Sequence, residues 1–199
     1  MNPRKMNQSN SHIENIKKKA DNGDIEMMIK YAEIQEKGKG VKKKYKIALK
    51  YYKMAADAGN IEAMKSYGWI KSNSTDISLI NLKEEYYYYE LAANRGDTYS
   101  MNICAMFLLK GNGVPVDKKK AFEYYQKSAE KGDIDGFHNM AKMIKDGDGV
   151  EADKVKAAQY FKKLADKNDK RSTKSMNMYA MMLNNGEGIQ MNKKESFRY

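Results

Sequence analysis

Few side chains in this sequence have the type and spacing that catalysis or metal binding requires. His12 and His138 lie far apart in the chain, and neither has a cysteine or a second histidine at ligand spacing. Cys104 is the single cysteine, so no disulfide within the chain and no cysteine zinc site can form. No base stands near Cys104 in the sequence to activate its thiol. We therefore expect no enzyme activity, no metal and no cofactor, and a buried structural role for Cys104.

Glycine pairs separated by one residue are a second candidate for chemistry, because glycine-rich loops can bind phosphate. Such pairs occur four times, as Gly38 and Gly40, Gly111 and Gly113, Gly147 and Gly149, and Gly186 and Gly188. A phosphate-binding loop needs a preceding strand and either a third glycine or a closing lysine–serine pair, and the sequence offers none of these. The first glycine of each pair instead suits the left-handed position that ends a helix. We therefore expect four structural turns.

Lysine runs favour acidic partners. The chain has 37 Lys and Arg residues against 26 Asp and Glu residues, which gives a formal net charge of +11. We define the basic edge as Lys39, Lys42, Lys43, Lys44, Lys118, Lys119 and Lys120, all near glycine turns or the helix starts that follow them. Such an edge could attract nucleic acid or another anionic surface. Acidic residues interrupt the pattern at residues 146–153, so ordinary solvation remains the leading explanation.

A run of four tyrosines at residues 86–89 could stack on nucleic-acid bases. Tyr88 and Tyr89 align with expected core aromatics elsewhere in the chain. Only Tyr86 and Tyr87 therefore remain available for the surface, and a structural role is favoured for them too.

The elements that must position these residues follow a repeat of 36 or 37 residues. Four repeats start at Gly23, Gly59, Gly96 and Gly132, and a fifth starts near Arg171. In each repeat a first segment has apolar or small residues along one helical face and ends at the turn. A second segment places tyrosines and alanines at positions i, i+3, i+4, i+7 and i+8, again one helical face. In the fourth repeat these residues are Ala157, Tyr160, Phe161, Leu164 and Ala165.

Helix caps and family resemblance agree with this pattern. Asp117, Asp153 and Asn192 stand where an N-cap is needed, whereas Lys44 occupies that place in the first repeat. The stretch from Gly132 to Ala165, GDIDGFHNMA…GDGV…KAAQYFKKLA, resembles a Sel-1-like repeat, a longer relative of the tetratricopeptide repeat. The resemblance extends from residue 23 to 199. It implies an all-α fold, an α-solenoid (right-handed superhelix) of antiparallel helix pairs, in a family whose members serve as adaptors in multiprotein assemblies.

The repeats set the expected organisation. We expect a flexible tail at 1–12, a half-repeat helix at 13–22 and repeats at about 23–58, 59–95, 96–131, 132–167 and 171–199. The second repeat replaces its glycine turn with residues 72–77, and a polar insertion at 168–170 precedes the fifth. The fifth repeat stops partway through its second helix, so we expect a truncated product.

One further set of residues is a candidate binding groove. Met28, Met64, Met101, Phe137 and Met176 recur five residues after each repeat start, with His138 beside them. In the family that the sequence resembles, first helices line the concave surface, so this apolar ladder is a hypothetical peptide groove. The alternative, favoured because large apolar residues are mostly interior, is burial between repeats.

These observations favour a non-enzymatic module that binds a protein or peptide along the concave surface. The alternative is RNA or anionic-surface binding through the basic edge, which would weaken steeply with salt. The resemblance also implies relatives with hydrolase activity, but no nucleophile–base pair is readable in this sequence. The first ten residues lack the apolar run of a signal peptide, and no stretch is apolar enough to span a membrane. We therefore expect a cytoplasmic protein.

Overall fold

The computed structural model describes residues 3–73, 76–167 and 169–199, with side chains from residue 11 onward in the first helix. The chain divides into two compact units, Met1–Arg95 and Gly96–Tyr199. Unit 1 contains α1 (Pro3–Asp21), α2 (Ile25–Lys37), α3 (Tyr45–Asp57), α4 (Ile61–Asn73), the 3-10 helix η1 (Ile77–Leu79) and α5 (Leu82–Asn94). Unit 2 contains α6 (Thr98–Lys110), α7 (Lys118–Glu130), α8 (Ile134–Asp146), α9 (Lys154–Ala165), η2 (Lys170–Ser172), α10 (Thr173–Asn185) and α11 (Lys193–Ser196).

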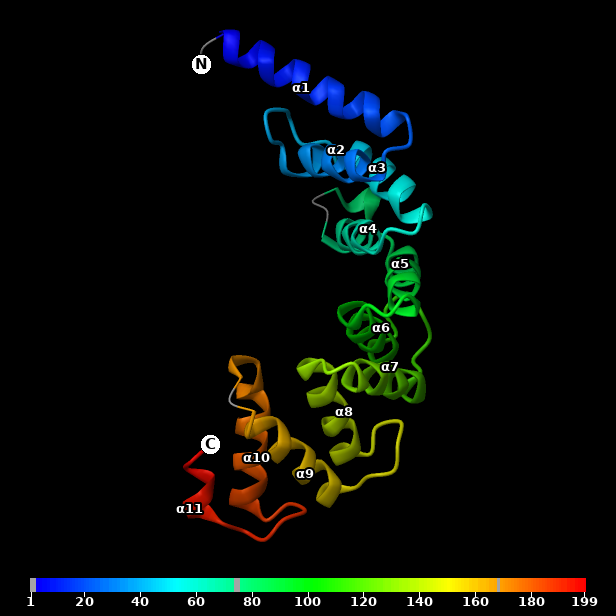
Figure 1. Ribbon diagram of the computed structural model, residues 1–199. Coiled ribbons are helices and arrows are strands. Elements are labelled where there is room, and N and C mark those ends of the chain that lie inside the picture. Colours follow the sequence, from blue (N-terminus) through cyan, green and yellow to red (C-terminus); the bar gives the residue numbers. More distant parts are fainter. Residues whose placement is uncertain (1–2, 74–75, 168) are drawn as a thin grey trace. The chain divides into compact units, whose positions relative to one another are not determined.

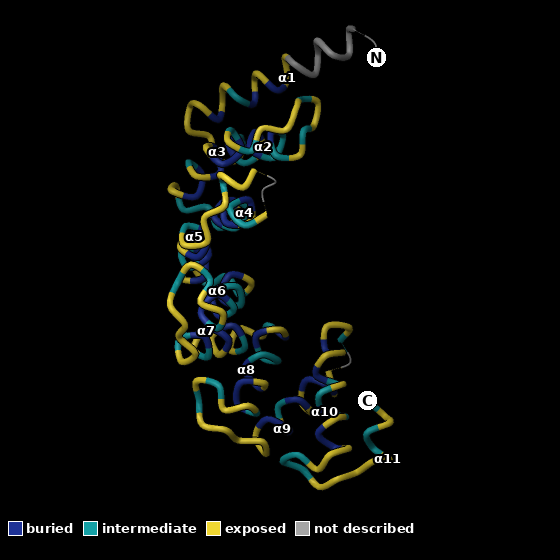
Figure 2. Tube along the Cα trace, turned by 180° about the vertical axis from the view of Figure 1, so that it is seen from behind, coloured by how far each residue is buried: buried dark blue, intermediate teal, exposed yellow. Residues whose placement is uncertain are grey.

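The fold is all-α and consists of sequential antiparallel helix pairs, as the repeat pattern predicts (Figure 1). Within each unit every helix packs against the next one along the chain, and in unit 2 α6 also meets α8. We call α2, α4, α6, α8 and α10 the first helices, and α3, α5, α7, α9 and α11 the second helices. Buried residues line the helix sides that face neighbouring helices, whereas the connections are largely exposed (Figure 2).

Short polar side chains start the helices where the sequence predicts them. The side chains of Asp117, Asp153 and Asn192 each accept a hydrogen bond from a backbone N–H in the first helical turn. Lys44 makes no such bond at the start of α3. Aspartates also cap the starts of α2, α6 and α8, which the sequence pattern did not single out.

The glycine turns end four first helices, as predicted. Gly38, Gly111, Gly147 and Gly186 occupy the C-cap in the left-handed conformation, with φ between 69° and 74°. Their backbone N–H groups bond back to carbonyls of the last helical turn.

The second glycine of the turn has a role that the sequence did not reveal. A Cβ atom at Gly149 would collide with the carbonyl oxygen of Lys118, and one at Gly188 would collide with that of Lys154. Glycine therefore lets each turn approach the first residue of the second helix in the preceding repeat, α7 or α9.

Alanine and tyrosine form the core between paired helices. In unit 1, Ala32, Ala48, Ala55 and Ala63 are fully buried, which lets helix backbones approach closely. Tyr52, on the same face as the alanines of α3, is only 1% exposed. The alternation of small and large residues in the sequence therefore allows the paired helices to pack closely.

The expected N-terminal tail needs correction. Helix α1 begins at Pro3, so residues 3–12 belong to the helix expected only at 13–22; proline suits the first helical position. Residues 1–2 of the expected tail lie outside the described residues. Ile16 and Ala20 of α1 are buried in the core of unit 1.

The two irregular connections are only partly described. In the second repeat, Asp76 caps η1, whose Leu79 packs against the core, while residues 74–75 lie outside the described part of the chain. In the insertion before the fifth repeat, Asp169 caps η2, and residue 168 is not described.

Candidate partner-binding surface

The apolar ladder expected to form a peptide groove is mostly core. Met28, Met64 and Met101 are 6%, 0% and 4% exposed, so they cannot form an accessible groove. They pack between helices because, in the first three repeats, the position five residues after the repeat start lies on the helix side that faces neighbouring helices. Phe137 and Met176 are only half-buried. The groove hypothesis is therefore wrong for the three methionines, and burial between repeats is the correct explanation for them.

The accessible side of the first helices carries a different apolar set in unit 2. On α6 the buried residues occupy one side, and Tyr99, Ile103, Met106 and Leu109 lie toward solvent at i, i+4, i+7 and i+10. Tyr99 is 52% exposed, and the other three are half-buried. Lys110, at the end, is the single charged residue of this helix. We call these four apolar residues the α6 stripe.

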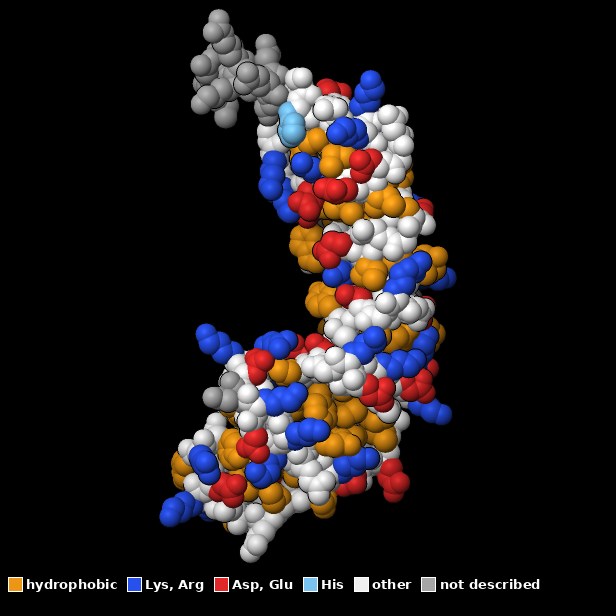
Figure 3. All heavy atoms as spheres, in the orientation of Figure 1, with side chains coloured by type: hydrophobic (Ala, Val, Ile, Leu, Met, Phe, Trp, Pro, Cys, Tyr) orange, Lys and Arg blue, Asp and Glu red, His pale blue; other side chains and the backbone are white. Residues whose placement is uncertain are grey.

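Other first helices expose single large apolar residues. Trp69 on α4 of unit 1 is 45% exposed, and Met181 on α10 of unit 2 is 57% exposed. On the face drawn in Figure 3, hydrophobic side chains also gather over α7 and α8, with Lys and Arg side chains around them. The helical periodicity of apolar and small residues, which predicts the core positions, does not predict the α6 stripe. The signal for it in the sequence is that α6 is apolar on both sides.

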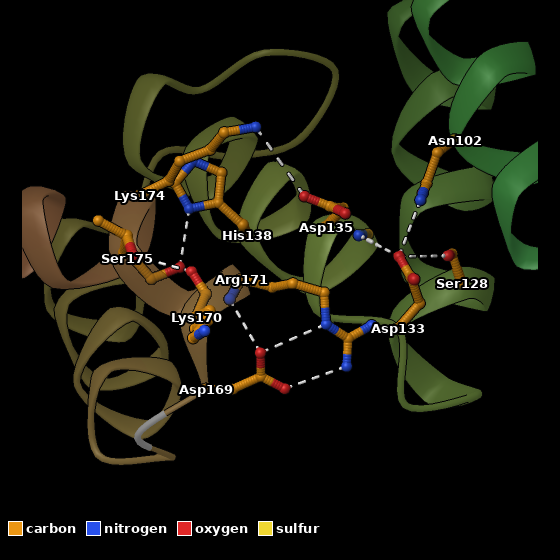
Figure 4. A network of polar contacts seen from close by, with 12 residues as sticks. Asn102, Ser128, Asp133, Asp135, His138, Asp169, Lys170, Arg171, Lys174 and Ser175 are labelled. Atoms are coloured by element: carbon orange, nitrogen blue, oxygen red, sulfur yellow. Dashed lines mark hydrogen bonds and ion pairs between the residues drawn. The ribbon is translucent and has the colours of Figure 1, made fainter.

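His138 belongs to a polar network between repeats in unit 2 (Figure 4). Its Nδ1 lies 2.9 Å from the hydroxyl oxygen of Ser175 on α10. At the matching place on α6, the Asn102 amide donates to Asp133, the N-cap of α8, at 2.8 Å. Burial lowers the pKa of His138, and Lys174 lowers it further, so the imidazole is neutral at pH 7.

The histidine–serine contact is structural. Ser175 is fully buried, so its hydroxyl is out of reach of a substrate. Cys104 is also fully buried, as expected. Among residues 3–73, 76–167 and 169–199, no group of three His, Cys, Asp or Glu side chains could hold a metal ion.

The basic edge is exposed except at the half-buried Lys120, and it is divided between the two units. Lys39, Lys42, Lys43 and Lys44 lie in unit 1, and Lys118, Lys119 and Lys120 lie in unit 2. Lys118 donates to Asp148, the middle residue of the next glycine turn, at 2.7 Å. Lys154 lies 3.6 Å from Glu187 in the corresponding place. Lysines at second-helix starts therefore partly serve to pair with the following turn.

The tyrosine run is less exposed than expected. Tyr88 and Tyr89 are core residues, as predicted. Tyr86 is also buried, at 7% exposure, and its hydroxyl donates to Glu90 at 2.8 Å. Within the run, Tyr87 alone is exposed, at 52%. A base-stacking platform of several tyrosines is therefore absent from this segment.

The fold and these contacts define an α-helical repeat array. The Sel1 repeat pattern matches residues 25–60, 86–97, 98–133, 138–169 and 173–199, and the chain belongs to the Sel1 repeat family. A comparison with curated proteins gives no match. In the described part of the chain, no helix is both long and apolar enough to cross a membrane.

Solved structures share the fold. A Sel1 repeat protein from Oxalobacter formigenes superposes with a TM-score of 0.79 at 24% identity, covering 89% of this chain and 71% of that one. The protective antigen c5321 of uropathogenic Escherichia coli, which displays an SLR fold, gives a TM-score of 0.71 at 22% identity. That match covers 92% of this chain and 46% of the antigen, so the chain spans under half of its length.

Proposed function

We propose that this chain is a non-enzymatic interaction module that binds a protein segment through the exposed side of the first helices of unit 2, with the α6 stripe as anchor. The observation that carries the proposal is the apolar character of that stripe. A surface helix normally presents polar residues to water, and α6 presents Tyr99, Ile103, Met106 and Leu109. Exposed apolar and aromatic surface of this kind is typical of interaction sites.

The neighbouring first helix adds charge to this surface. Helix α8 meets α6, and Lys142 on α8 is exposed and forms no ion pair within the described residues. His138 on the same helix is neutral at pH 7, because burial lowers its pKa. An apolar stripe beside a lysine fits a partner segment that has apolar residues next to an acidic one.

The alternative of RNA or anionic-surface binding through the basic edge has weaker support. Lys118 is already paired with Asp148, and Tyr86 is buried. Nucleic-acid binding depends on counterion release and falls steeply with salt, whereas contact with an apolar stripe does not. Salt dependence therefore separates the two functions.

The test compares two substitutions that add the same charge. Tyr99→Glu places a carboxylate on the α6 stripe, and Val155→Glu, at a residue 57% exposed on α9, is the control. Proteins captured from a nuclease-treated lysate by the unmodified chain and by Val155→Glu should be lost with Tyr99→Glu. Their affinity should change less than about threefold between about 50 and 500 mM salt, against about 10³-fold or more for an RNA complex. Equal capture by all three chains, or a collapse of binding at high salt, would overturn the proposal.

A further inference from the structure

The segment that leads into α5 of unit 1 exposes a cluster of aliphatic side chains. Ile77, Ile80 and Leu82 are 81%, 40% and 37% exposed. The glycine-turn connections of unit 2 each expose at most one large apolar residue, as Val116 before α7 or Met191 before α11. Single exposed apolar residues are ordinary, whereas a cluster of them marks a contact surface. We call residues 76–82 the apolar connection.

Hydrogen bonds and packing hold the apolar connection in place. The Asp76 carboxylate accepts hydrogen bonds from the N–H and the hydroxyl of Ser78, at 3.1 and 2.6 Å. Leu79, between the two isoleucines, is half-buried and packs against the core of unit 1. The connection therefore places one aliphatic side chain against the core and leaves Ile77 and Ile80 exposed.

A lysine-rich segment precedes α3 and includes its start. Residues 37–46 contain six lysines and no acidic residue. Lys37 is paired with Glu33 on α2, at 3.0 Å. The other five are exposed, and none of them forms an ion pair with another residue that the structure describes: Lys39, Lys42, Lys43, Lys44 and Lys46. We call residues 39–46 the basic segment. Its lysines thus differ from Lys118 of unit 2, which Asp148 neutralises.

The basic segment and the apolar connection are neighbours in unit 1. Hydrogen bonds from Ser78 lower the pKa of Asp76, and the nearby Lys46 ammonium lowers it further. Tyr45 of the basic segment packs against the same core cluster as Leu79. Asp76 is the one acidic residue of the apolar connection, and it opposes an anionic partner. Five unpaired lysines outweigh it, so the surface that the two segments form is both apolar and cationic.

We propose that this surface docks on an anionic lipid bilayer, with Ile77 and Ile80 inserted among the headgroups and the five lysines against anionic lipid. Firm attachment at a bilayer surface needs both contributions, because a few aliphatic groups or a basic cluster alone bind only weakly. Lysine is a flexible point charge that needs no fixed geometry, which suits a fluid surface. RNA would account for the lysines but not for the isoleucines, because aliphatic side chains do not stack on bases as aromatic ones do.

The docking surface belongs to unit 1 and the α6 stripe to unit 2, so this proposal is independent of the proposed function. The first experiment measures co-sedimentation with vesicles of phosphatidylcholine alone and with vesicles that also contain about 30% phosphatidylserine. We expect an affinity at least about tenfold higher for the anionic vesicles. Equal binding to both kinds of vesicle, or no binding to either, would contradict the proposal.

A pair of isoleucine substitutions tests the apolar contribution. Ile77→Ser with Ile80→Ser should weaken binding to the anionic vesicles at least about tenfold, because two aliphatic side chains are lost from the contact and the charge is unchanged. The matched control is Val116→Ser with Met191→Ser, at residues 57% and 56% exposed in unit 2, and it should bind like the unmodified chain. Undiminished binding by the isoleucine pair would show that these side chains do not insert.

Two pairs of lysine substitutions test whether the charge acts locally. Lys42→Gln with Lys43→Gln and Lys118→Gln with Lys119→Gln each lower the net charge by two. The first pair should weaken binding about tenfold or more, and the second should change it less than about threefold. Equal losses would mean that net charge alone matters, and docking through unit 1 would be wrong.

Insertion also has a spectroscopic signature. Ile77→Cys labelled with a nitrobenzoxadiazole dye should emit more strongly and at shorter wavelength on anionic vesicles, and labelled Val116→Cys should not. Cys104 is fully buried and stays unlabelled. A uridine homopolymer replaces the vesicles in the last arm. Tighter binding to this RNA than to the vesicles, unaffected by the isoleucine pair, would assign the lysines to nucleic acid and overturn the proposal.

Discussion

At the scale of single residues, Glu85 departs most from the pattern of its repeat. Helices α3, α7 and α9 bury alanine at this place, as Ala48, Ala121 and Ala157, whereas Glu85 is a carboxyl group only 4% exposed. Its Oε2 atom has no hydrogen-bond partner among the described residues. Burial raises the pKa of Glu85 to about 7, and a hydrogen bond from Ser72 opposes this only in part. The adjacent Glu84 has a lowered pKa despite burial, because Tyr67 and Lys71 donate hydrogen bonds to it.

These neighbouring glutamates predict opposite effects of the same substitution. The folded chain favours protonated Glu85, whereas the unfolded chain ionises near pH 4.5, so its stability cost appears as pH rises from 4.5 and is complete above pH 7. Glu85→Gln should therefore raise the free energy of unfolding at about pH 8 by about 1–3 kcal/mol and change it little at about pH 4. Glu84→Gln should lower it at the higher pH. Urea unfolding at both pH values measures this, and equal effects of the two variants would contradict it.

His138 predicts a second pH effect, of opposite sign, in unit 2. Burial lowers its pKa below the usual 6.5, with Lys174 and Lys142 adding to the shift and Asp135 opposing it. The folded chain thus favours neutral histidine, and stability falls as pH decreases through 6.5, where the unfolded chain takes up the proton.

His138→Asn should remove this component, because Asn102 shows that an amide at this place can hydrogen-bond to the start of the next first helix without titrating. Thermal unfolding between about pH 7 and 5 should show a smaller fall in Tm for the variant than for the unmodified chain. An identical fall in both would show that His138 does not titrate in this way.

At the scale of elements, the glycine turn has two separate structural roles. Its first glycine ends a first helix in the left-handed conformation, and its second lets the turn approach the preceding repeat. The middle residue can pair with a lysine of the same helix start, as Asp148 does with Lys118. Helix termination and inter-repeat register therefore depend on the same three residues.

Two alanine substitutions distinguish the energetic cost of backbone strain in the glycine turn from the cost of a steric clash with the preceding repeat. Gly132 and Gly149 both have positive φ, of 86° and 73°, so alanine costs about 1–2 kcal/mol at either position. A Cβ at Gly132 meets nothing within 4 Å, whereas one at Gly149 would collide with the Lys118 carbonyl. Gly149→Ala should therefore lose about 1–3 kcal/mol more than Gly132→Ala in chemical unfolding. Equal losses would show that the turn does not set the register.

At the scale of the whole molecule, the repeat pattern sets which residues are exposed and charged and which residues are buried in the core. Much of the lysine excess lies on exposed surfaces, and several lysines pair with acids one helical turn away, as Lys53 does with Asp57 at 2.9 Å. Such exposed pairs contribute about 0–1 kcal/mol each, so they affect solubility and partner choice more than stability. Stability comes mainly from the alanine and tyrosine core of each unit.

The sequence alone determined the helices, their pairing and the turns. Periodicity and capping depend on neighbours a few residues apart, so the repeat pattern by itself places Ala141 in the core, Asp153 at a helix start and Gly147 at a helix end. The tertiary structure decided which apolar residues reach the surface. Met101 and Met106 both lie on α6, yet Met101 is buried and Met106 lies toward solvent. The hollow lined by Gln126, Phe137 and Tyr160 likewise depends on three helices, α7, α8 and α9, because these side chains come together only when neighbouring repeats pack.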